Sequence, residues 1–415
     1  MDHNKNGFEA GNFPRSYWLE VPPVQGSTEA PPQRASIVVI GSGLSGASSG
    51  YWLQKTGFED VLMVDYEVEQ AATFRNAGHI LYGTVESMKA LSEIHGAEKA
   101  KQIWQFSIDI CEQVGATIRE LGIDADYRQD GYLVVSIDKT EEQECRESVE
   151  LLTSMGFQSE FVPAHVVNDL GFKNCYGARY EKGSAQAHPT KFRNGLVKAF
   201  TDKGGLYHSG VKVTSIEDTA EGVVLQTSKG PIHADAVVLA TNAYTPLVEP
   251  FFRGLIDPFR GQIITSKPLK NHRFPVRYPH SFDHGYEYSL ITEDNRLLIG
   301  GWRHHSSTRE VGTYSIEVNP FIEQGLKDFV EQHYNIEEQV EWEFSWSGIM
   351  AASRTSLPFI GATTSPRVYA CAGYTGHGFS WAHGSAKLLA DIIAGNPLSP
   401  EQQGVAHYFN PKLAK

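Results

Sequence analysis

One stretch, residues 36–65, constrains the fold of this chain more than any other. It opens with a run of apolar, mostly β-branched residues, Ile37 to Ile40, which is typical of a strand buried on both faces. The pattern G-x-G-x-x-G follows at Gly41–Gly46, and a segment rich in small residues after it predicts a helix packed closely on a sheet. A second apolar run ends at Asp65, nineteen residues past Gly46. This order of strand, glycine turn, helix, strand and acid predicts a βαβ unit that binds a dinucleotide.

Each residue of this motif has a physical reason. The first glycine permits the tight turn, the second lets the backbone approach a pyrophosphate, and the third lets the helix pack against the strand. The helix then points its positive end and its free N–H groups at phosphate. A glycine turn alone also occurs in ordinary strand–turn–helix units, but Asp65 is placed to accept hydrogen bonds from ribose hydroxyls. An acid there favours NAD or FAD over NADP.

Length, charge and cysteine usage narrow the class of protein. A chain of 415 residues predicts two domains, and a net charge of -13 without a block of Lys and Arg argues against nucleic acid or an anionic membrane as partner. The four cysteines are scattered and form no C-x-x-C, so we expect neither a disulfide framework nor a metal site, and a reducing, cytoplasmic compartment. No apolar run approaches the ~18 residues of a membrane span. We therefore expect a soluble protein.

A second glycine-rich turn lies near the carboxyl end. An apolar strand, Tyr369–Ala372, runs into Gly373–Gly378, and helical spacing of apolar residues follows from Phe379 to Gly395. A second helix N-terminus that follows a glycine-rich turn is a second place where negative charge is stabilised. Such a place suits the ring of a reduced flavin, which is negatively charged.

These motifs occur in a specific order. The Gly41–Gly46 turn, Asp65, the Arg75–Gly78 loop, a segment from Ala240 to Tyr244, Leu357–Gly361 and Gly373–Gly378 follow one another as in the FAD-dependent amine and amino-acid oxidases of the D-amino-acid oxidase superfamily. The chain resembles this superfamily from about Ser36 to Ile393, and within it the gamma-glutamylputrescine oxidase branch most.

The resemblance implies an α/β fold class, in which a Rossmann-type FAD-binding domain is interleaved with an antiparallel-sheet substrate domain. The expected domains are an extended N-terminal arm at 1–34, an FAD-binding domain at 35–110, 184–248 and 345–400, a substrate domain at 111–183 and 249–344, and a C-terminal tail at 401–415. The arm is rich in proline, and Phe13, Tyr17 and Trp18 are expected to attach it to the body of the protein.

The resemblance also implies the residues that bind FAD. Those expected around the ADP half are Gly41, Ser42, Gly43, Leu44, Ser45, Gly46, Asp65 and Tyr66, with Val213 at adenine and Ala240 and Thr241 in the same set. Those expected along the ribityl chain and flavin are Thr73, Arg75, Asn76, Ala77, Gly78 and His79. Those expected at the pyrimidine edge of the ring are Gly373, Gly376, His377, Gly378 and Phe379. Some relatives attach flavin covalently through His or Cys, but we expect His79 to act as a hydrogen-bond partner.

The expected catalytic residues are His79, Trp302, Arg303, Arg354 and Tyr374, and His304 and His305 are expected beside them in the pocket. The chain also departs from the superfamily in two places. Glycine-oxidase-like relatives carry a carboxylate-binding Arg where this chain has Met350, so a plain α-amino acid lacks its clamp unless Arg303 or Arg354 replaces it. The oxygen-activating Lys of sarcosine-oxidase-like relatives is missing from the run Arg296–Ile299, which leaves oxidase or dehydrogenase open.

The sequence therefore predicts an FAD-dependent enzyme that acts on CH–NH groups. We expect it to oxidise the C–N bond of a primary or secondary amine, such as a polyamine derivative or an N-substituted amino acid. In the superfamily a hydride passes to flavin N5, water hydrolyses the imine, and oxygen or another acceptor takes the electrons, with H2O2 as the product in oxidases. Two alternatives remain: an amino-acid oxidase or dehydrogenase of the glycine or proline type, and a non-catalytic FAD-binding subunit of a complex. The oligomeric state is not indicated.

Overall fold

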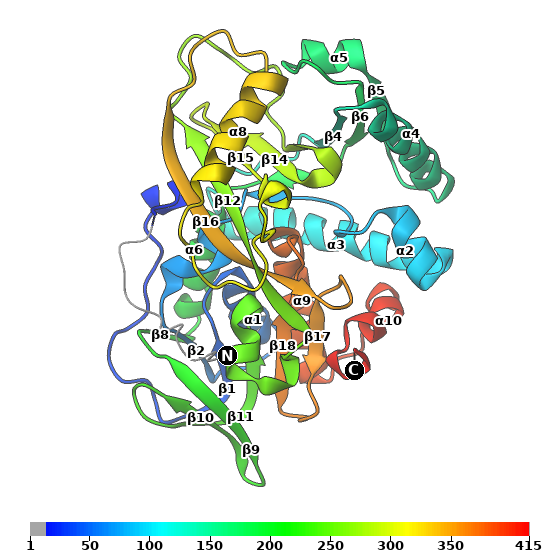
Figure 1. Ribbon diagram of the computed structural model, residues 1–415. Coiled ribbons are helices and arrows are strands. Elements are labelled where there is room, and N and C mark those ends of the chain that lie inside the picture. The colour runs from blue at the N-terminus through cyan, green and yellow to red at the C-terminus, as the bar shows by residue number, and fades with distance from the viewer. Residues whose placement is uncertain (1–13, 415) are drawn as a thin grey trace.

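The computed structural model describes residues 14–414 and contains two large sheets, one below the other in Figure 1. The lower sheet begins with β1 (Arg34–Ile40), whose neighbours on either side are β2 (Val61–Asp65) and β11 (Ile232–Leu239). Beyond these lie β8 (Leu206–Ser209) on one side and β18 (Val368–Ala372) and β17 (Phe359–Ala362) on the other. All neighbours in this row pair in parallel except β17 with β18. The β9–β10 hairpin (Val213–Thr219 and Gly222–Thr227) joins the first half of β11.

Long helices cover the lower sheet and bury its apolar residues. The helices α1 (Leu44–Lys55) and α9 (Gly378–Ala394) pack against each other, α6 (Pro189–Asp202) packs on α1, and α3 (Ala97–Leu121) packs on α9. Small residues at the start of α1 allow this close approach, because a Cβ on Gly50 would already press on the ring of Phe200. The shorter helices α2 (Met88–His95) and α10 (Pro400–Ala406) pack on α3, whereas α7 (Thr245–Val248) lies against β9 on the other face of the sheet.

The upper sheet is largely antiparallel. Its eight strands, in spatial order, are β16 (Trp342–Ser353), β12 (Ile256–Ser266), β15 (Leu297–Gly300), β14 (Glu287–Ile291), β13 (His280–Phe282), β4 (Tyr132–Ser136), β6 (Gly177–Glu181) and β5 (Glu160–Pro163). Only β13 and β4 pair in parallel. Three helices flank this sheet, α8 (Pro320–His333), α4 (Lys139–Ser154) and α5 (Ala164–Asp169). A small ribbon of β3 (His79–Ile80) and β7 (Ala185–Gln186) lies apart from both sheets.

The two long strands β12 and β16 connect the sheets. They pair along their length, from Ile256 with Ser353 to Ser266 with Trp342, and descend from the upper sheet to the lower one in Figure 1. Gly348 in β16 lies so close to the 71–79 loop that a Cβ there would meet Arg75 Cβ at 2.7 Å. The α/β fold class with an interleaved antiparallel domain is confirmed by this arrangement.

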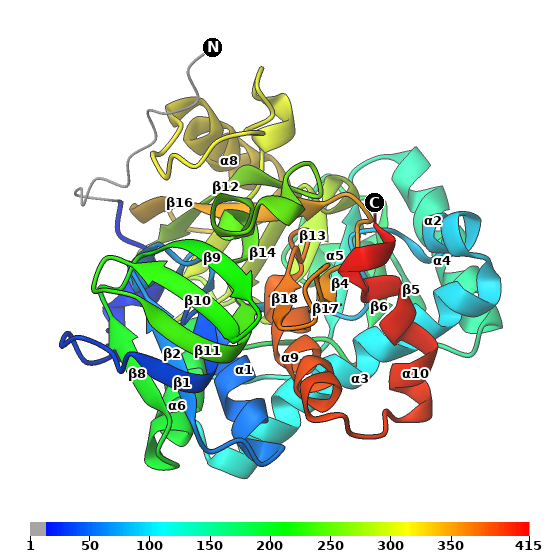
Figure 2. The same ribbon diagram turned by 90° about the horizontal axis from the view of Figure 1, so that it is seen from below.

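Two of the expected domain boundaries fall inside continuous elements of the structure. The boundary at residue 110 falls inside α3, and the boundary at 345 falls inside β16, because one continuous helix and one continuous strand pass across the expected divisions. Residues 401–414, within the expected C-terminal tail, lie in α10 and in two short 3-10 turns, His407–Phe409 and Pro411–Leu413. They pack on α3, as Figure 2 shows from below, and bury Val405 and Phe409. The helix α10 has seven residues, too few to show a periodic pattern of apolar residues in the sequence.

Two further details concern the N-terminal arm and the segment around Val213. Trp18 is buried and its Nε1 donates to Asn76 O at 2.6 Å, so the arm is attached there, while the expected contact at Phe13 lies outside the described residues. The strand β8 pairs in parallel with β2, and Val213, the residue expected at adenine, begins an antiparallel hairpin soon after it. Across residues 14–414, every helix is either too short or too polar to cross a bilayer.

Candidate active site

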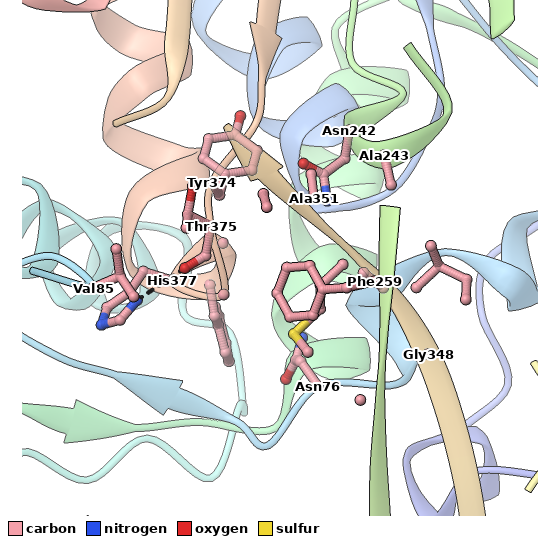
Figure 3. A pocket seen from close by; sticks show the side chains of 18 of the residues that line it. Asn76, Val85, Asn242, Ala243, Phe259, Gly348, Ala351, Tyr374, Thr375 and His377 are labelled. Atoms are coloured by element: carbon pink, nitrogen blue, oxygen red, sulfur yellow. Dashed lines mark hydrogen bonds between the residues drawn. The ribbon is translucent and has the colours of Figure 1, made fainter. Parts of the chain in front are cut away.

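A cavity of about 1250 Å³ lies between the carboxyl ends of the parallel strands and the wall formed by β12, β14 and β16. Figure 3 shows it, with Phe259, Gly348 and Ala351 on one side and Tyr374, Thr375 and His377 on the other. Pockets for drug-sized ligands are commonly ~300–1,000 Å³. This cavity therefore has room for a dinucleotide and a small substrate together.

The first glycine turn enters the cavity directly from β1. Gly41 has a positive φ of 98°, and a Cβ on Gly46 would overlap with the carbonyl oxygen of Gly41. Both positions therefore require glycine. At the start of α1, the N–H of Leu44 donates to Thr73 Oγ1 at 2.7 Å, while Gly43, Leu44 and Ser45 line the cavity.

Asp65 and a buried arginine hold the turn in place. Asp65 Oδ2 accepts hydrogen bonds from Ser42 N at 2.5 Å and from Ser42 Oγ at 2.9 Å. Arg193 of α6 donates to Ser42 O at 2.8 Å and to Ser42 Oγ at 3.0 Å, and reaches Tyr207 Oη at 3.1 Å. Burial raises the pKa of the Asp65 carboxyl, against the hydrogen bonds from Ser42 and the charge of Arg193. Reasoning from sequence missed Arg193, although its place on the same helical face as Leu196 and Phe200 was a usable signal.

The 71–79 loop is attached to both sheets. Arg75 is buried and donates to Ser347 O in β16 at 2.8 Å, and Trp346 Nε1 donates back to Arg75 O at 3.2 Å. Asn76 Nδ2 donates to Thr73 O, and Asn76 Oδ1 accepts from Gly78 N at 2.7 Å. Burial lowers the pKa of Arg75 to about 10. These contacts fix the loop across the cavity.

The second glycine turn lies beside the first. The Tyr374 hydroxyl is 2.7 Å from Ser45 Oγ in α1 and donates to Cys371 O at 2.8 Å, and Asn242 Oδ1 accepts from Gly373 N at 3.0 Å. The helix α9 starts at Gly378, and Gly376, His377 and Gly378 line the cavity. Burial lowers the pKa of His377, which keeps its ring neutral. Two helix N-termini therefore approach one cavity.

Most of the expected cofactor residues line this cavity. Those that do are Gly41, Gly43, Leu44, Ser45, Asp65, Tyr66, Thr73, Arg75, Asn76, Ala77, His79, Val213, Ala240, Thr241, Gly376, His377, Gly378 and Phe379. Four lie behind its surface, Ser42, Gly46, Gly78 and Gly373. These four lie next to lining residues in the chain and shape the backbone there.

Some of the expected catalytic residues lie at the cavity, and others do not. His79, Arg303 and Tyr374 line the cavity, but Trp302 and Arg354 do not. Trp302 packs under α8, where a Cβ on Gly325 would overlap with its indole, and Arg354 is exposed to solvent. The Tyr374 hydroxyl is engaged by Ser45 and Cys371, so it connects the two turns. His304 and His305 lie outside the lining as well.

His79 is a neutral ring on the cavity wall. Its Nε2 lies 3.0 Å from Ser289 O, and since a carbonyl only accepts, Nε2 carries the proton and Nδ1 is left as an acceptor. Burial lowers the pKa of His79 to about 3, with the nearby His280 acting in the same direction. The ring therefore stays uncharged near neutral pH.

The opposite wall contains Phe259 and Tyr288, which sequence reasoning did not find, besides Met350 and Arg303, which it had named. From Phe259 onward, β12, β14 and β16 contribute neutral side chains that include Tyr288 and Met350. Burial raises the pKa of Tyr288 to about 12, so its hydroxyl keeps its proton. Arg303 stands over the Phe259 ring at 4.7 Å and the Tyr286 ring at 5.5 Å. No local motif marks these residues, because strands distant in sequence bring them together.

The residues fit a flavin dinucleotide. A strand-end carboxylate, two glycine-rich helix N-termini and a cavity at the carboxyl ends of parallel strands are the features that hold a pyrophosphate and a ribose. The fold and the site together define an FAD-dependent oxidoreductase. Residues 36–392 match the family model described as FAD dependent oxidoreductase (DAO), so the chain belongs to this family and its cofactor is FAD.

Named relatives act on amines and amino acids, as far as their names state. The chain is 27% identical over 371 residues to the gamma-glutamylputrescine oxidoreductase of Escherichia coli, covering 87% of this chain and 84% of that protein. Among solved structures, the glycine oxidase of Geobacillus kaustophilus matches with a TM-score of 0.75 and 20% identity, covering 89% of this chain and 96% of that one. The L-proline dehydrogenase of P. horikoshii matches with a TM-score of 0.73 and 20% identity, covering 92% and 98%. At these identities the structures show a shared fold.

Proposed function

We propose that the chain oxidises the C–N bond of a primary or secondary amine, such as a polyamine derivative or an N-substituted amino acid. Bound FAD supplies the hydride acceptor. The observation that carries the proposal is the neutral wall of Phe259, Tyr288 and Met350 opposite the second glycine turn. A carboxylate on the reacting carbon would be desolvated against this wall, and an unpaired buried charge is costly.

The arginines of the lining support this choice. Arg75 donates to backbone carbonyls, and Arg179 pairs with the buried Glu181 at 2.6 Å. Within residues 14–414, the Arg303 guanidinium makes one hydrogen bond, to Arg309 O at 3.4 Å. A substrate carboxylate would therefore bind at Arg303, and an amine that carries a carboxylate at a distance from the reacting C–N bond suits this arrangement.

The protein's own groups then position the amine. Nδ1 of His79 accepts a hydrogen bond and the Tyr288 hydroxyl donates one, and both stay in these forms across the ordinary pH range because of their shifted pKa values. The aromatic and aliphatic wall excludes water from the reacting bond. The relative from Escherichia coli is named for a polyamine derivative, which agrees with this class of substrate.

The second candidate is an amino-acid oxidase or dehydrogenase of the glycine or proline type. The glycine oxidase and L-proline dehydrogenase structures share the fold, and Arg303 could serve as the carboxylate clamp. We propose oxygen or another small acceptor for the electrons, and peroxide detection distinguishes the two. The proposed compartment is the cytoplasm, since Cys111, Cys145, Cys175 and Cys371 are free thiols.

An anaerobic reduction screen of the purified yellow protein tests the proposal. We expect primary and secondary amines to bleach the flavin bands, and glycine and proline to leave them unchanged. The variant Arg303→Met should raise KM at least tenfold for amines with a distant carboxylate and leave simple amines unaffected, whereas the exposed Arg253→Met should change neither. Reduction by simple α-amino acids but by no amine would refute the proposal in favour of the second candidate.

A further inference from the structure

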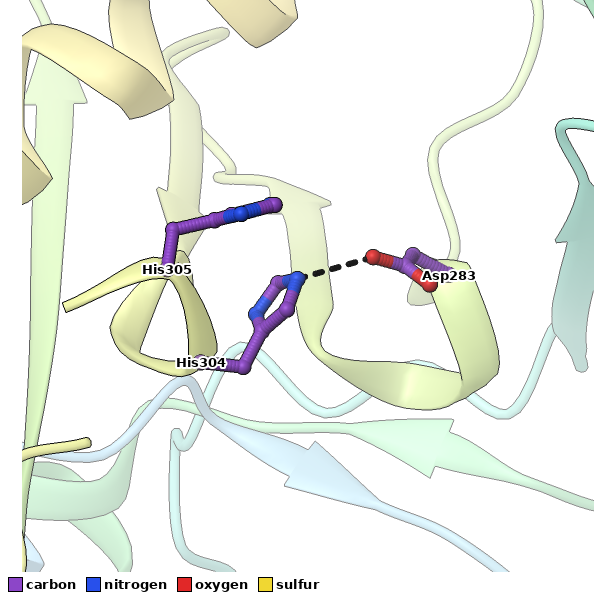
Figure 4. A group of neighbouring side chains, drawn as sticks. All are labelled: Asp283, His304 and His305. Carbon is purple, nitrogen blue, oxygen red and sulfur yellow. Dashed lines mark ion pairs between the residues drawn. The ribbon is translucent and has the colours of Figure 1, made fainter. Parts of the chain in front are cut away.

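Two short turns of the upper sheet meet at the edge of the cavity. One turn, Asp283–Gly285, follows β13, and the other, Arg303–His305, follows β15. His304 Nε2 lies 2.9 Å from Asp283 Oδ2, and the rings of His304 and His305 have centroids 3.9 Å apart. Figure 4 shows both rings extending toward the Asp283 carboxylate from the same turn. One donor atom from each of the three residues lies within 4.8 Å of the others.

A fourth group lies behind His304. Glu287 of β14 is fully buried, its Oε1 accepts from Trp302 N at 3.0 Å, and Oε1 is 3.8 Å from His304 Nδ1. Its Oε2 has no hydrogen-bond partner among residues 14–414. Buried carboxylate oxygens are rarely left without a partner, so this one requires an explanation. Within the same residues, Glu287 has one ion-pair partner, His304.

We propose that Asp283, His304 and His305 bind one first-row divalent cation such as Zn²⁺, and that Glu287 orients His304 from the far side. Imidazole nitrogens and a carboxylate are ligands that Zn²⁺ accepts. A metal-bound histidine commonly binds through one nitrogen while its other N–H donates to a carboxylate. His304 approaches this arrangement: Nε2 faces Asp283, and Nδ1 lies 3.8 Å from Glu287 Oε1, a gap that a small shift of the ring would close.

The ion also accounts for the charges and the ring contact. Asp283 and Glu287 are both carboxylates, and no Lys or Arg ion pair with either is found among residues 14–414. A divalent cation offsets their charge, and binding by both residues accounts for the 3.9 Å between the centroids of the two tilted rings. Ligands of a tetrahedral Zn²⁺, with bonds of about 2.0–2.2 Å, lie about 3.3–3.6 Å apart. The 2.9 Å between His304 Nε2 and Asp283 Oδ2 would therefore widen slightly, and His305 would adjust to complete the set. The exposed side chain of His305 can make this adjustment.

A bound ion would join the two turns at the rim of the cavity. Gly285, Tyr286 and Arg303, which lie beside the proposed ligands in the chain, line the cavity. A second group of possible ligands, Glu141, Asp283 and His284, shares Asp283, and His284 already lies 3.6 Å from Glu141 and 3.3 Å from Glu144. The test must therefore separate the two groups.

Zinc titration of the EDTA-treated holoprotein tests the site, with calorimetry for stoichiometry and thermal denaturation for stabilisation. We expect one Zn²⁺ per chain and a melting temperature that rises with Zn²⁺. His304→Gln and His305→Gln should weaken binding at least tenfold, and Glu287→Gln about 10–100-fold if it orients the ligand. The exposed His407→Gln is the matched control and should bind as the parent does.

Three outcomes would overturn the proposal. These are no saturable binding by the parent protein, equal affinity of the parent and His305→Gln, and loss of binding in His284→Gln with retention in His305→Gln. The last would move the ion to the other group. Because His305 is exposed, its variant should keep its flavin spectrum and its melting temperature without metal, which separates loss of a ligand from loss of the fold.

Discussion

The two walls of the cavity differ in how their polar groups are satisfied. On the cofactor side, Ser42, Asp65 and Arg193 bond to one another, and Tyr374 connects the two glycine turns. On the substrate side, Phe259, Tyr288 and Met350 form a largely neutral surface, and Arg303 keeps most of its donors free of protein partners within residues 14–414.

This difference indicates that one wall holds the cofactor and the other contacts the substrate. Groups that are already bonded to the protein hold a fixed geometry and lose little entropy when a cofactor binds. Groups without protein partners are available to a substrate, and they can be exchanged without disturbing the flavin site. We therefore expect substitutions on the cofactor side to cost FAD and stability, and substitutions on the substrate side to change selectivity.

The largest effect is expected for Gly46→Ala on the cofactor side. The added Cβ would overlap with Gly41 O, which forces α1 away from β1 and costs more than about 3 kcal/mol. The purified variant should contain almost no flavin by absorbance. Gly395→Asn at the left-handed end of α9 is the control, since its Cβ would meet nothing within 4 Å and Asn tolerates this conformation. Normal flavin content in Gly46→Ala would contradict the rigidity of this wall.

Next in size is Arg193→Met, which fills the same space without donors. Ser42 O and Tyr207 Oη would lose a charged partner in a buried place, at a cost of about 2–4 kcal/mol. We expect a lower urea midpoint and at least tenfold weaker FAD binding in a reconstitution titration. Arg34→Met removes an exposed pair with Asp235 and should change stability by less than about 1 kcal/mol. Equal effects of the two variants would show that Arg193 does not position the turn.

Met350→Arg tests the substrate side in the opposite direction. A guanidinium at this lining position would offer a carboxylate clamp beside the reacting bond. We expect full flavin content and at least a tenfold shift of kcat/KM from amines toward simple α-amino acids, measured on paired substrates. Met350→Leu is the matched control without the charge. Loss of flavin in Met350→Arg alone would mean that the two walls are not independent.

A smaller effect is expected for Asp65→Asn, for which the chain offers a close control. Asp65 accepts from the N–H and hydroxyl of Ser42 near the cavity, and Asp60 accepts from the N–H and hydroxyl of Ser36. If Asp65 also binds the ribose, Asp65→Asn should weaken FAD about tenfold, or about 1.4 kcal/mol, while Asp60→Asn should not. Similar FAD affinity in both variants would remove the ribose role of Asp65.

The smallest effect is a pH dependence that both sides should share. Burial lowers the pKa of His383 on the cofactor side to about 3 and that of His280 in the upper sheet to about 4. Each folded-state pKa lies below the unfolded value of about 6.5, so the unfolded chain binds more protons between these limits. Stability is then complete above pH 6.5 and falls as the pH drops toward 4.

The two histidines should contribute equally to this slope. His383→Gln and His280→Gln should each reduce the dependence of the unfolding free energy by up to about 1.4 kcal/mol per pH unit, measured by urea unfolding with excess FAD. The exposed His407→Gln should leave the slope unchanged. If only one of the two histidine variants changed the pH dependence of the unfolding free energy, the two sides of the protein would differ in their cores as well as in their cavity walls.

The cofactor side was predictable because its signals are local. Gly41, Gly43 and Gly46 occupy six consecutive residues together with Ser42, and the geometry of one turn needs them at that spacing. The same holds for Gly376 and Gly378 before α9. Arg193 was not predicted, because its partner Ser42 lies 151 residues away in the sequence. Tyr374 was expected near substrate, but its hydroxyl bonds to Ser45, 329 residues away.

The sequence by itself determined the strand–turn–helix motifs, the FAD family and the antiparallel character of the second sheet, because period, turn chemistry and helix ends depend on neighbouring residues. The tertiary structure alone decided which side chains face the cavity. Trp302 and Arg303 are adjacent in the chain, yet one packs under α8 and the other lines the cavity. The direction of a side chain at the end of a strand depends on what packs against it, and those partners come from distant segments of the chain.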